Sequence, residues 1–390
     1  MYQYVFGIIF NILELILFII GAYYTKTAFF SLFSAGKYAV NSNMNRFAVI
    51  IPAHNEAGVL GRLIKSIKSA DYPQELIDIY VVADGCTDNT ADTARAFGAV
   101  VLEISPASCK GDALKSAFGF LKDKDFDAVI VFDADNIADK NFFKEINEEH
   151  SRGAEAVQGY IDSLNPYSSW VANAHSVWYW LTNRIMQTGR SNLNLGCRIG
   201  GTGFAVSKNV LAAVPWETST LAEDAEYTCI LALSGIKVGY AKKAVVYDEK
   251  PLSFSQSVQQ RKRWASGLRD VQGEYTLKLL FKGKLNAILG LWNDFLYPFI
   301  YIALLAISVF ADFGIFASIP GKAVLWFYLA ANIIISIIAL AADKKLNYKT
   351  VLNSFGFLLY VLSWIPVGIF GIFSNSKNWH HTPHGKENRR

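Results

Sequence analysis

Two acidic pairs and one cationic segment contain the side chains best suited to chemistry. The acidic pairs are Asp133-Ala-Asp135 and Glu223-Asp224, and the cationic segment is Gln260-Arg-Lys-Arg-Trp264. Carboxylates two residues apart can hold Mg²⁺ or Mn²⁺, which prefer oxygen ligands and bridge phosphates. An arginine binds two phosphate oxygens at once through its planar fork. The combination predicts chemistry on a substrate that carries phosphate.

Each of these groups also has a purely structural interpretation. Asp133 and Asp135 could cap a loop or the next helix, and Glu223-Asp224 could simply suit the dipole of a first helical turn. The three cations could form a solvated helix face or anchor the chain to lipid headgroups. The groups taken together favour the chemical interpretation, in which one residue of the second acidic pair deprotonates an acceptor hydroxyl.

Strands and helices alternate between Arg46 and about Lys250, which predicts a parallel sheet with helices on both faces. Ligands bind such sheets beyond the carboxyl ends of the strands. Residues 52–56, 84–88 and 133–135 all follow predicted strands, so we expect them to meet at one cleft. The predicted strands are 47–51, 77–82, 100–102 and 128–132, and the predicted helices are 59–70, 90–97 and 111–121.

Three further segments could line that cleft. Asp84 could accept hydrogen bonds from a base or ribose, while Thr87 or Asp88 could cap the next helix. Lys110 opens a predicted helix and could neutralise phosphate or bind the base, or it could be an ordinary surface lysine. The glycine cluster at 200–203 is flexible enough to line a sugar or an acceptor, although a glycine cluster alone is weak evidence.

Composition separates this chain from ordinary soluble proteins. Apolar residues make up 52% of the 390 residues and charged residues 18%, against typical values of about 45–50% and about 25%. A net charge of only +4, without a basic stripe of interleaved aromatic residues, argues against nucleic acid as a partner. The four cysteines lack C-x-x-C spacing, which indicates neither a zinc site nor a disulfide framework and fits a reduced, cytoplasmic domain.

Long apolar stretches predict membrane-spanning helices at both ends of the chain. They cover residues 5–33, 295–317, 323–342 and 351–373, and about 20 apolar residues suffice to span a bilayer. Cations after the first stretch place the middle domain in the cytoplasm. The basic loop at 343–349 is expected on the cytoplasmic side. One span before the domain and three after it would then leave the C-terminus outside, whereas the basic C-terminal tail favours the inside. The number of spans therefore stays open.

Residues 168–186 form an aromatic segment with few charges, which contains Trp170, Trp178, Tyr179 and Trp180. Such a segment could be packed in the core, or it could be an amphipathic helix at the membrane surface. We favour the membrane surface.

The motifs resemble, in type and order, those of the membrane-embedded family 2 glycosyltransferases, which include cellulose, hyaluronan, chitin-oligosaccharide and poly-N-acetylglucosamine synthases. The resemblance covers about residues 46–273, and its most discriminating part is the Gln-x-x-Arg-Trp element. Ala83, Cys86 and Leu221-Ala222 depart from the usual pattern, which bears on base recognition and not on the chemistry. The motifs are Pro52-Ala-His-Asn-Glu56, Ala83-Asp-Gly-Cys-Thr-Asp88, Lys110-Gly111, Asp133-Ala-Asp135, Gly200-Gly-Thr-Gly-Phe204, Glu223-Asp224 and Gln260-Arg-Lys-Arg-Trp264.

This resemblance implies a glycosyltransferase-A fold, a Rossmann-like α/β mixed sheet, in a cytoplasmic domain joined to transmembrane helices. It also implies a UDP-sugar donor, Mg²⁺ or Mn²⁺ as cofactor, and inversion by one in-line displacement. Asp224 would be the general base, and Asp133 and Asp135 would bind the metal. Donor or nucleotide contacts would come from Pro52, Asn55, Glu56, Asp84, Lys110, Asp133 and Arg263, and acceptor contacts from Gly201, Thr202, Gly203, Glu223, Gln260 and Trp264.

We therefore expect a transmembrane anchor at 1–44, a glycosyltransferase-A domain at 45–250, interfacial helices at 251–285, and a transmembrane region with a basic tail at 286–390. The expected protein is a multi-pass plasma-membrane enzyme that adds hexose or N-acetylhexosamine units to a growing β-linked polysaccharide and couples this to export. Two alternatives stay open: single addition to a lipid, as in a ceramide-glucosyltransferase-like protein, and an inactive sugar-binding or transport subunit. Expected partners are the UDP-sugar, a polysaccharide or glycolipid acceptor and membrane lipids, with homo-oligomerisation left open.

Overall fold

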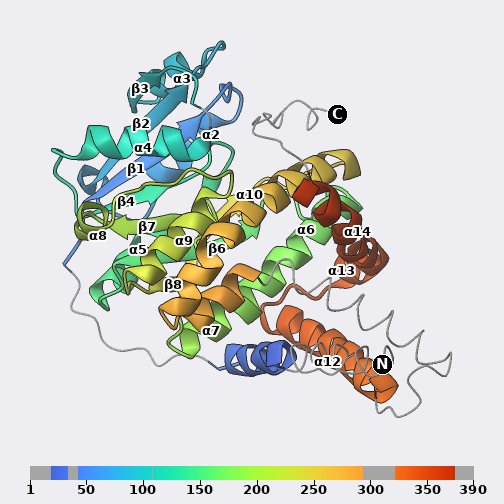
Figure 1. Cartoon of the computed structure of the whole chain (residues 1–390). Coiled ribbons are helices and arrows are strands. Elements are labelled where there is room, and N and C mark those ends of the chain that lie inside the picture. Colours follow the sequence, from blue (N-terminus) through green and yellow to red (C-terminus); the bar gives the residue numbers. More distant parts are fainter. Residues whose placement is uncertain (1–18, 34–42, 108, 293–320, 374–390) are drawn as a thin grey trace.

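The computed structural model describes residues 19–33, 43–107, 109–292 and 321–373. Its centre is an eight-stranded sheet (Figure 1). In spatial order the strands are β3 (Val100–Ile104), β2 (Ile77–Asp84), β1 (Phe47–Ala53), β4 (Ala128–Val131), β7 (Phe204–Ser207), β6 (Ala156–Ser163), β8 (Val238–Asp248) and β5 (Ile137–Ala138).

The sheet has a parallel half and a mixed half. Strands β3, β2, β1 and β4 are parallel to one another. β7 then runs antiparallel to both β4 and β6, while β6 and β8 are parallel and β5 is antiparallel to β8. The α/β fold with a mixed sheet that the resemblance implied is therefore confirmed, whereas the parallel sheet predicted from the alternation of strands and helices holds only for β3, β2, β1 and β4.

Both faces of the sheet are covered, which explains why its central strands read as continuous apolar runs. Phe47, Val49 and Ile51 of β1 join the core on one face, and Ala48 and Ile50 join the core on the other. The first face packs against α2 (Leu60–Lys68), α3 (Thr90–Ala96) and α5 (Phe142–Ser151). The second packs against α4 (Lys110–Leu121), α6 (Trp170–Leu181), α8 (Lys208–Ala213) and α9 (Glu223–Leu233).

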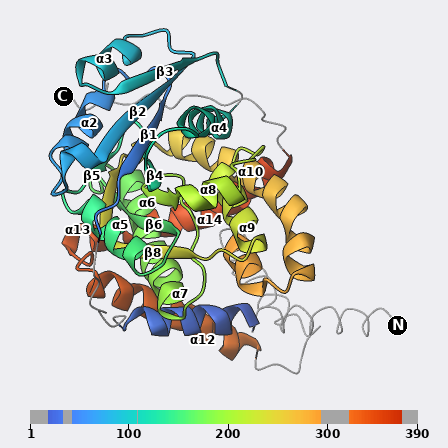
Figure 2. The same ribbon diagram turned by 90° about the vertical axis from the view of Figure 1, so that its left-hand side faces the viewer.

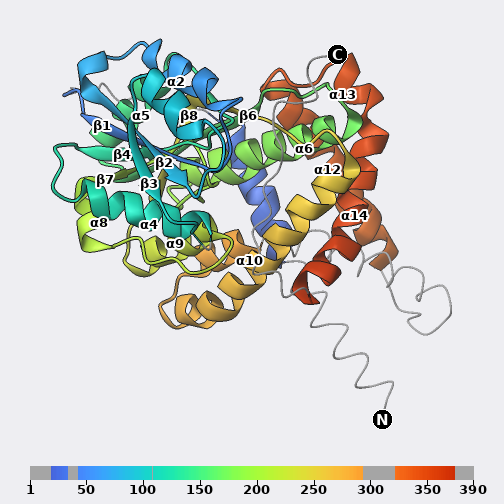
Figure 3. The ribbon, with the colours of Figure 1, turned by 90° about the horizontal axis from the view of Figure 1, so that it is seen from above.

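A long helix, α10 (Phe254–Phe281), connects the sheet domain to the C-terminal helices. It begins at a capping box, in which the Ser253 side chain accepts from the Gln256 backbone N–H and the Gln256 side chain accepts from that of Ser253. α10 packs against α9 and against α14 (Ser354–Phe373), and α14 also packs against α6 (Figure 3). The helices α6, α10 and α14, which are far apart in the sequence, thus form one cluster beside the sheet.

The helical segment at 168–186 lies inside the molecule, so the core-packing alternative describes it better than the membrane surface does. The first half of α6 is almost completely buried, and Trp180 is 2% exposed. The chain continues as a buried π-helix at Thr182–Thr188 and then as α7 (Gly189–Asn192). Figure 2 shows α7 beside helix 19–31 and α12 (Gly321–Ala342) at one end of the molecule.

Two of the four predicted spans coincide with described helices. The predicted span at 351–373 corresponds to α13 (Tyr348–Leu352) and α14, whose segment Ser354–Gly371 is long and apolar enough to cross a membrane. The span at 323–342 corresponds to α12, which contains a shorter apolar stretch at Ala330–Ala342. Of the span predicted at 5–33, residues 19–33 are described and form a helix at 19–31, whereas the span predicted at 295–317 lies outside the described residues.

Candidate active site

The polar segments predicted to meet at one cleft do line one cavity of about 310 Å³. It lies at the carboxyl ends of β1, β2 and β4 and is closed on its far side by α6, α9, α10 and α14. The predicted site residues that line it are Pro52, Glu56, Asp84, Lys110, Asp133, Asp135, Gly201, Thr202, Glu223, Asp224, Gln260, Arg263 and Trp264.

Two predicted contact residues, Asn55 and Gly203, shape the backbone and do not line this cavity. Asn55 has a φ of 56°, and its Oδ1 accepts hydrogen bonds from the backbone N–H groups of Thr87 (2.8 Å) and Asp88 (3.3 Å). Gly203 has a φ of +61°, and a Cβ there would lie 2.5 Å from Cγ1 of Val246. Asn55 therefore holds a loop and Gly203 allows close packing, and the ligand contacts expected of them stay predictions.

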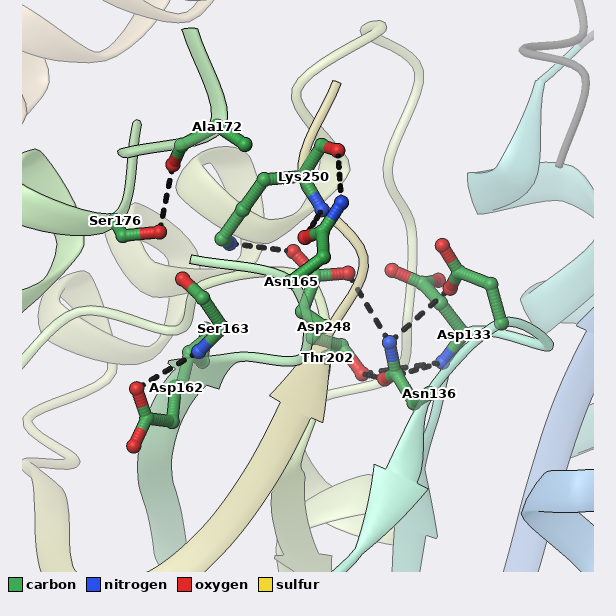
Figure 4. Close-up of polar contacts among 12 residues, drawn as sticks. Asp133, Asn136, Asp162, Ser163, Asn165, Ala172, Ser176, Thr202, Asp248 and Lys250 are labelled. Carbon is green, nitrogen blue, oxygen red and sulfur yellow. Dashed lines mark hydrogen bonds and ion pairs between the residues drawn. The ribbon is translucent and has the colours of Figure 1, made fainter. Parts of the chain in front are cut away.

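Asn136 organises the turn that carries Asp133 and Asp135 (Figure 4). Its Nδ2 donates to Oδ1 of Asp135 and to Oδ1 of Asp248, at 3.1 Å in both cases. Its Oδ1 accepts from the backbone N–H of Asp133 at 3.2 Å and from the Thr202 hydroxyl. The amide thus ties the end of β4 to the end of β8 and to the glycine-rich loop, so Asp133 and Asp135 are held in place from three elements.

Negative charge accumulates around this turn. Burial, together with the charges of Asp248 and Asp133, raises the pKa of Asp135 well above its ordinary value. Burial and the charge of Asp133 also raise the pKa of Glu56 to about 8. A divalent cation on Asp133 and Asp135 would relieve this repulsion, and carboxylate oxygens are the ligands that Mg²⁺ and Mn²⁺ prefer.

The residues therefore fit a divalent ion held by few protein ligands. In the described part of the chain, no group of three or more His, Cys, Asp or Glu side chains is arranged to hold a metal. Two carboxylates would leave coordination positions for phosphate oxygens and water, which is how Mg²⁺ is usually bound with a phosphorylated substrate.

Lys110, at the first turn of α4, is the cation at the centre of the cavity. Its ammonium group forms an ion pair with Asp133, donates to the Gly201 carbonyl at 2.7 Å, and lies 3.8 Å from Oε1 of Glu223. Burial acts to lower the pKa of Lys110, but the charges of Asp133 and Glu223 outweigh it and raise the pKa. Lys110 thus stays charged and is not an ordinary surface lysine.

Glu223 and Asp224 occupy the first turn of α9, where the helix dipole favours acidic groups. Burial raises the pKa of Glu223 to about 7, although the charge of Lys110 acts to lower it. Gly201 lies beside the second acid, since a Cβ there would be in ordinary contact, 3.6 Å, with Oδ2 of Asp224, and its φ of +81° is what favours glycine at this position.

Glu226 positions this first turn and was not recognised in the sequence. Its Oε2 accepts from the backbone N–H groups of Ser219 (2.9 Å) and Thr220 (2.8 Å), and Tyr275 of α10 donates to its Oε1 at 3.2 Å. These bonds fold the preceding loop onto α9 and fasten it to α10. Only its place three residues after Glu223 in the same helix could have drawn attention to it.

The cations of the Gln260–Trp264 segment divide between two faces of α10. Gln260, Arg263 and Trp264 share one face by their i, i+3, i+4 spacing and line the cavity. Burial lowers the pKa of Arg263, and the charges of Glu223 and Asp133 act in the opposite direction, so this guanidinium lies on the same side of the molecule as both acids.

Arg261 faces away from the cavity and joins α10 to α14. It is fully buried, and its Nη1 donates to the Tyr360 carbonyl at 3.1 Å and to the Ser363 hydroxyl at 2.9 Å. Its guanidinium also lies over the Tyr360 and Trp364 rings. Arg261 therefore has a structural role, but as a buried link between two helices and not as part of a solvated face or a headgroup anchor. Arg263 is the cation in the cavity.

Aromatic side chains from three helices line the side of the cavity next to α14. Trp364 of α14 lies 6.5 Å from Trp264 and 6.1 Å from Trp178 of α6, measured between ring centroids. Trp178 and Trp364 were not predicted as site residues, because one belongs to a segment assigned to the membrane surface and the other to a predicted span. Gln260 lies beside them, and its Oε1 is buried without a hydrogen-bond partner among the described residues.

Comparison with known proteins identifies related sequences and folds. The family model described as "Glycosyltransferase like family 2" matches residues 45–267. Probable glycosyltransferase YdaM of Bacillus subtilis (strain 168) is 24% identical over 358 residues, which cover 85% of this chain and 83% of that protein. Beta-monoglucosyldiacylglycerol synthase of Synechocystis sp. is 25% identical over 231 residues, which cover 56% of this chain and 47% of that protein.

One solved structure is similar over nearly the whole chain. It is the mannosyltransferase PcManGT from Pyrobaculum calidifontis in complex with GDP-Man and Mn²⁺. It matches with a TM-score of 0.60 at 16% identity and covers 92% of this chain and 97% of that one. At this identity the match shows the shared fold, a mixed α/β fold of the glycosyltransferase-A kind.

Proposed function

The chain belongs to the glycosyltransferase like family 2, and on this premise we propose that it is a metal-dependent, inverting transferase. It moves a hexose or N-acetylhexosamine from a UDP-sugar to an acceptor hydroxyl. The observation that carries the proposal is that one cavity contains the base Asp224, the carboxylates Asp133 and Asp135, and the cation Arg263. These residues come from three separate parts of the chain.

The donor occupies the side of the cavity formed by the strand ends. Asp84 binds the base or ribose there, although one of its carboxylate oxygens, Oδ1, already accepts from the backbone N–H of Ala107 at 2.7 Å. Lys110 and Arg263 face the diphosphate and offset its charge. Mg²⁺ or Mn²⁺, when bound at Asp133 and Asp135, supplies further charge neutralisation for the departing diphosphate.

The chemical step is a single displacement. The Asp224 carboxylate takes the proton of the acceptor hydroxyl, and that oxygen forms a bond to the anomeric carbon. The bond from this carbon to the diphosphate oxygen breaks, and UDP leaves with the electron pair. Because attack and departure take place on opposite faces of the carbon, the configuration is inverted. Lys110 and Arg263 stabilise the charge that grows on the leaving group.

The acceptor occupies the opposite, aromatic side of the cavity. Trp178 and Trp264, which are partly exposed, offer flat faces on which sugar rings stack, and Trp364, which is 3% exposed, packs against both. Oε1 of Gln260 accepts from a sugar hydroxyl. Trp364 belongs to α14, the candidate membrane-crossing helix. This supports an acceptor that is the end of a growing β-linked polysaccharide, made on the cytoplasmic side of the plasma membrane and exported along the helices.

A lipid acceptor is the second candidate. Because α14 is the candidate membrane-crossing helix and forms part of the cavity wall, a lipid beside it would equally present a hydroxyl to Asp224. The name of the Synechocystis relative also describes synthesis of a glycosylated diacylglycerol. In this case one sugar is added and no chain grows.

The test is turnover by the purified full-length protein in detergent with native lipids. We would supply radiolabelled UDP-sugars, with GDP-mannose as a further donor, in the presence of Mn²⁺, Mg²⁺ or EDTA, and then separate the products by size and by extraction into organic solvent. A ladder of saccharides that requires metal supports polysaccharide synthesis, whereas one extractable labelled lipid supports the second candidate. No turnover of any donor would overturn the proposal and favour an inactive binding or transport subunit.

A further inference from the structure

A second cavity, of about 260 Å³, lies along α9, on the helix face that includes Ala225, Thr228, Cys229 and Ala232. Its other walls come from the loop after α7, the start of β8, and the helix at 285–292. Thr228, Cys229 and Ala232 of α9 line it, whereas Asp224 lines the first cavity. Arg198 lines both cavities, so the two lie next to each other.

The charges around this second cavity have a single sign. Its lining includes the four cations Arg190, Arg198, Lys237 and Lys284, and none of the described residues that line it is Asp or Glu. The rest of the lining is largely small or apolar, with Leu195, Ile236, Leu285 and Leu291 as its large apolar members. Such a site attracts an anion and also has room for apolar groups attached to that anion.

Arg190 is the buried member of this group and is held rigidly. It is 5% exposed, its Nε donates to the Gly196 carbonyl at 2.8 Å, and its Nη2 donates to the Asn286 carbonyl at 3.0 Å. Its Nη1 is buried and has no hydrogen-bond partner among the described residues, and none of the ion pairs between described residues includes Arg190. A buried guanidinium that lacks a counter-charge is costly, and an anionic ligand would remove that cost.

We propose that this second cavity binds a phosphate group, either free or carried by a lipid headgroup. Phosphate has enough acceptor oxygens to engage a guanidinium fork and an ammonium group at once. The first turn of helix 285–292 also borders the cavity, and the positive end of a helix favours anions.

The surroundings of the cavity suit a lipid as the carrier. Asn192, in α7, donates through Nδ2 to the carbonyls of Phe30 (2.8 Å) and Phe33 (2.9 Å) in the N-terminal segment at 19–33. Phe29, Leu32 and Phe33 of that segment are exposed apolar side chains. An apolar surface therefore lies close to the anion site, as a headgroup with acyl chains requires.

The experiment compares Lys284→Gln with Lys282→Gln in the full-length protein. Lys284 lines the second cavity, while Lys282 is an exposed lysine two residues away that does not line it. Each protein would be placed in phosphatidylcholine nanodiscs, and binding of phosphatidylglycerol and of inorganic phosphate would be measured separately by native mass spectrometry and by the shift in melting temperature. Loss of one charge-assisted contact should weaken binding about tenfold in Lys284→Gln and leave Lys282→Gln like the wild type.

The outcomes also identify the source of the phosphate. Selective retention of phosphatidylglycerol that millimolar phosphate does not displace, and that Lys284→Gln loses, assigns the cavity to a lipid headgroup. Binding of inorganic phosphate that Lys284→Gln loses, without preference for the lipid, assigns it to a free phosphate compound. If neither probe binds, or if both variants bind as the wild type does or lose binding equally, the proposal is wrong. Donor turnover by both variants confirms that they are folded.

Discussion

The active-site cavity has two walls that are held in place by different means. The sheet wall consists of Asp84, Asp133 and Asp135 at strand ends, and short hydrogen bonds from neighbouring loops hold it. The helix wall consists of the side chains that α6, α10 and α14 contribute, and packing between helices holds it. If the proposed function holds, donor chemistry depends on local backbone geometry, whereas acceptor contacts depend on α6, α10 and α14 staying together.

Asp224, which lies between the two walls, gives the largest expected effect. Asp224→Asn keeps the size of the side chain but cannot take the acceptor proton, so kcat should fall by about 10²–10⁴-fold. Binding of UDP, measured by calorimetry, should stay within about twofold of the wild type because the sheet wall is intact. Transfer that persists near the wild-type rate would remove Asp224 from its role as base.

Substitutions of Arg263 and Arg261 distinguish a catalytic role from a structural role of neighbouring cations in α10. Arg263→Met should lower kcat by about 10²-fold with little change in melting temperature, because its guanidinium lines the cavity and, in the proposed mechanism, stabilises the leaving group. Arg261→Met should lower the free energy of unfolding by about 1–3 kcal/mol, because it removes the buried bonds to Tyr360 and Ser363. Activity assays and thermal unfolding of both variants check this, and equal loss of activity at unchanged stability would contradict the division.

Trp364 tests whether the helix wall binds the acceptor. Trp364→Leu should reduce kcat/KM for the acceptor by about 5–20-fold, because it removes the ring against which Trp178 and Trp264 pack, and such aromatic contacts contribute about 1 kcal/mol beyond their buried area. The dissociation constant of UDP should not change. Trp170→Leu is the matched control, because Trp170 stacks on Phe254 and does not line the cavity. Similar effects of both changes would mean that Trp364 acts through stability alone.

The smallest expected effect is that of Glu56→Gln on the thermal stability of the metal-free protein. The pKa of Glu56 is about 8 in the folded protein and 4.5 ordinarily. Between pH 4.5 and pH 8 the folded state therefore binds more protons than the unfolded state. The contribution of Glu56 to stability therefore falls as pH rises from 4.5 to 8. In EDTA, Glu56→Gln should melt about 2–4 °C above the wild type at pH 8.5, a shift that corresponds to about 1 kcal/mol.

The advantage of Glu56→Gln should shrink as the pH falls toward 4.5 and disappear below it, where the wild-type carboxyl becomes protonated in both states. Glu75→Gln, at an exposed glutamate, should show no such dependence on pH. An advantage of Glu56→Gln that does not vary with pH would show that the substitution acts through packing and not through charge.

The two walls also differ in how far the sequence predicts them. Asp84, Asp133 and Asp135 were placed correctly at one cleft, because parallel strands bring their carboxyl ends to one edge of the sheet. Trp178 and Trp364 were missed, because nothing local to either residue shows that α6 and α14 pack together beside α10. The same applies to Arg261, whose neighbour Arg263 has the same charge but faces the cavity.

The sequence by itself determined the mixed α/β character of the domain, the order of its motifs and the chemistry that they can perform. These properties follow from hydrophobic periodicity and from residue types at strand ends, which act over a few residues. Only the tertiary structure decided which side chains of α10 enter the cavity, that α6 is buried, and that four cations surround a second cavity. Those results depend on contacts between segments that are distant in the sequence, where packing selects one face of a helix over another.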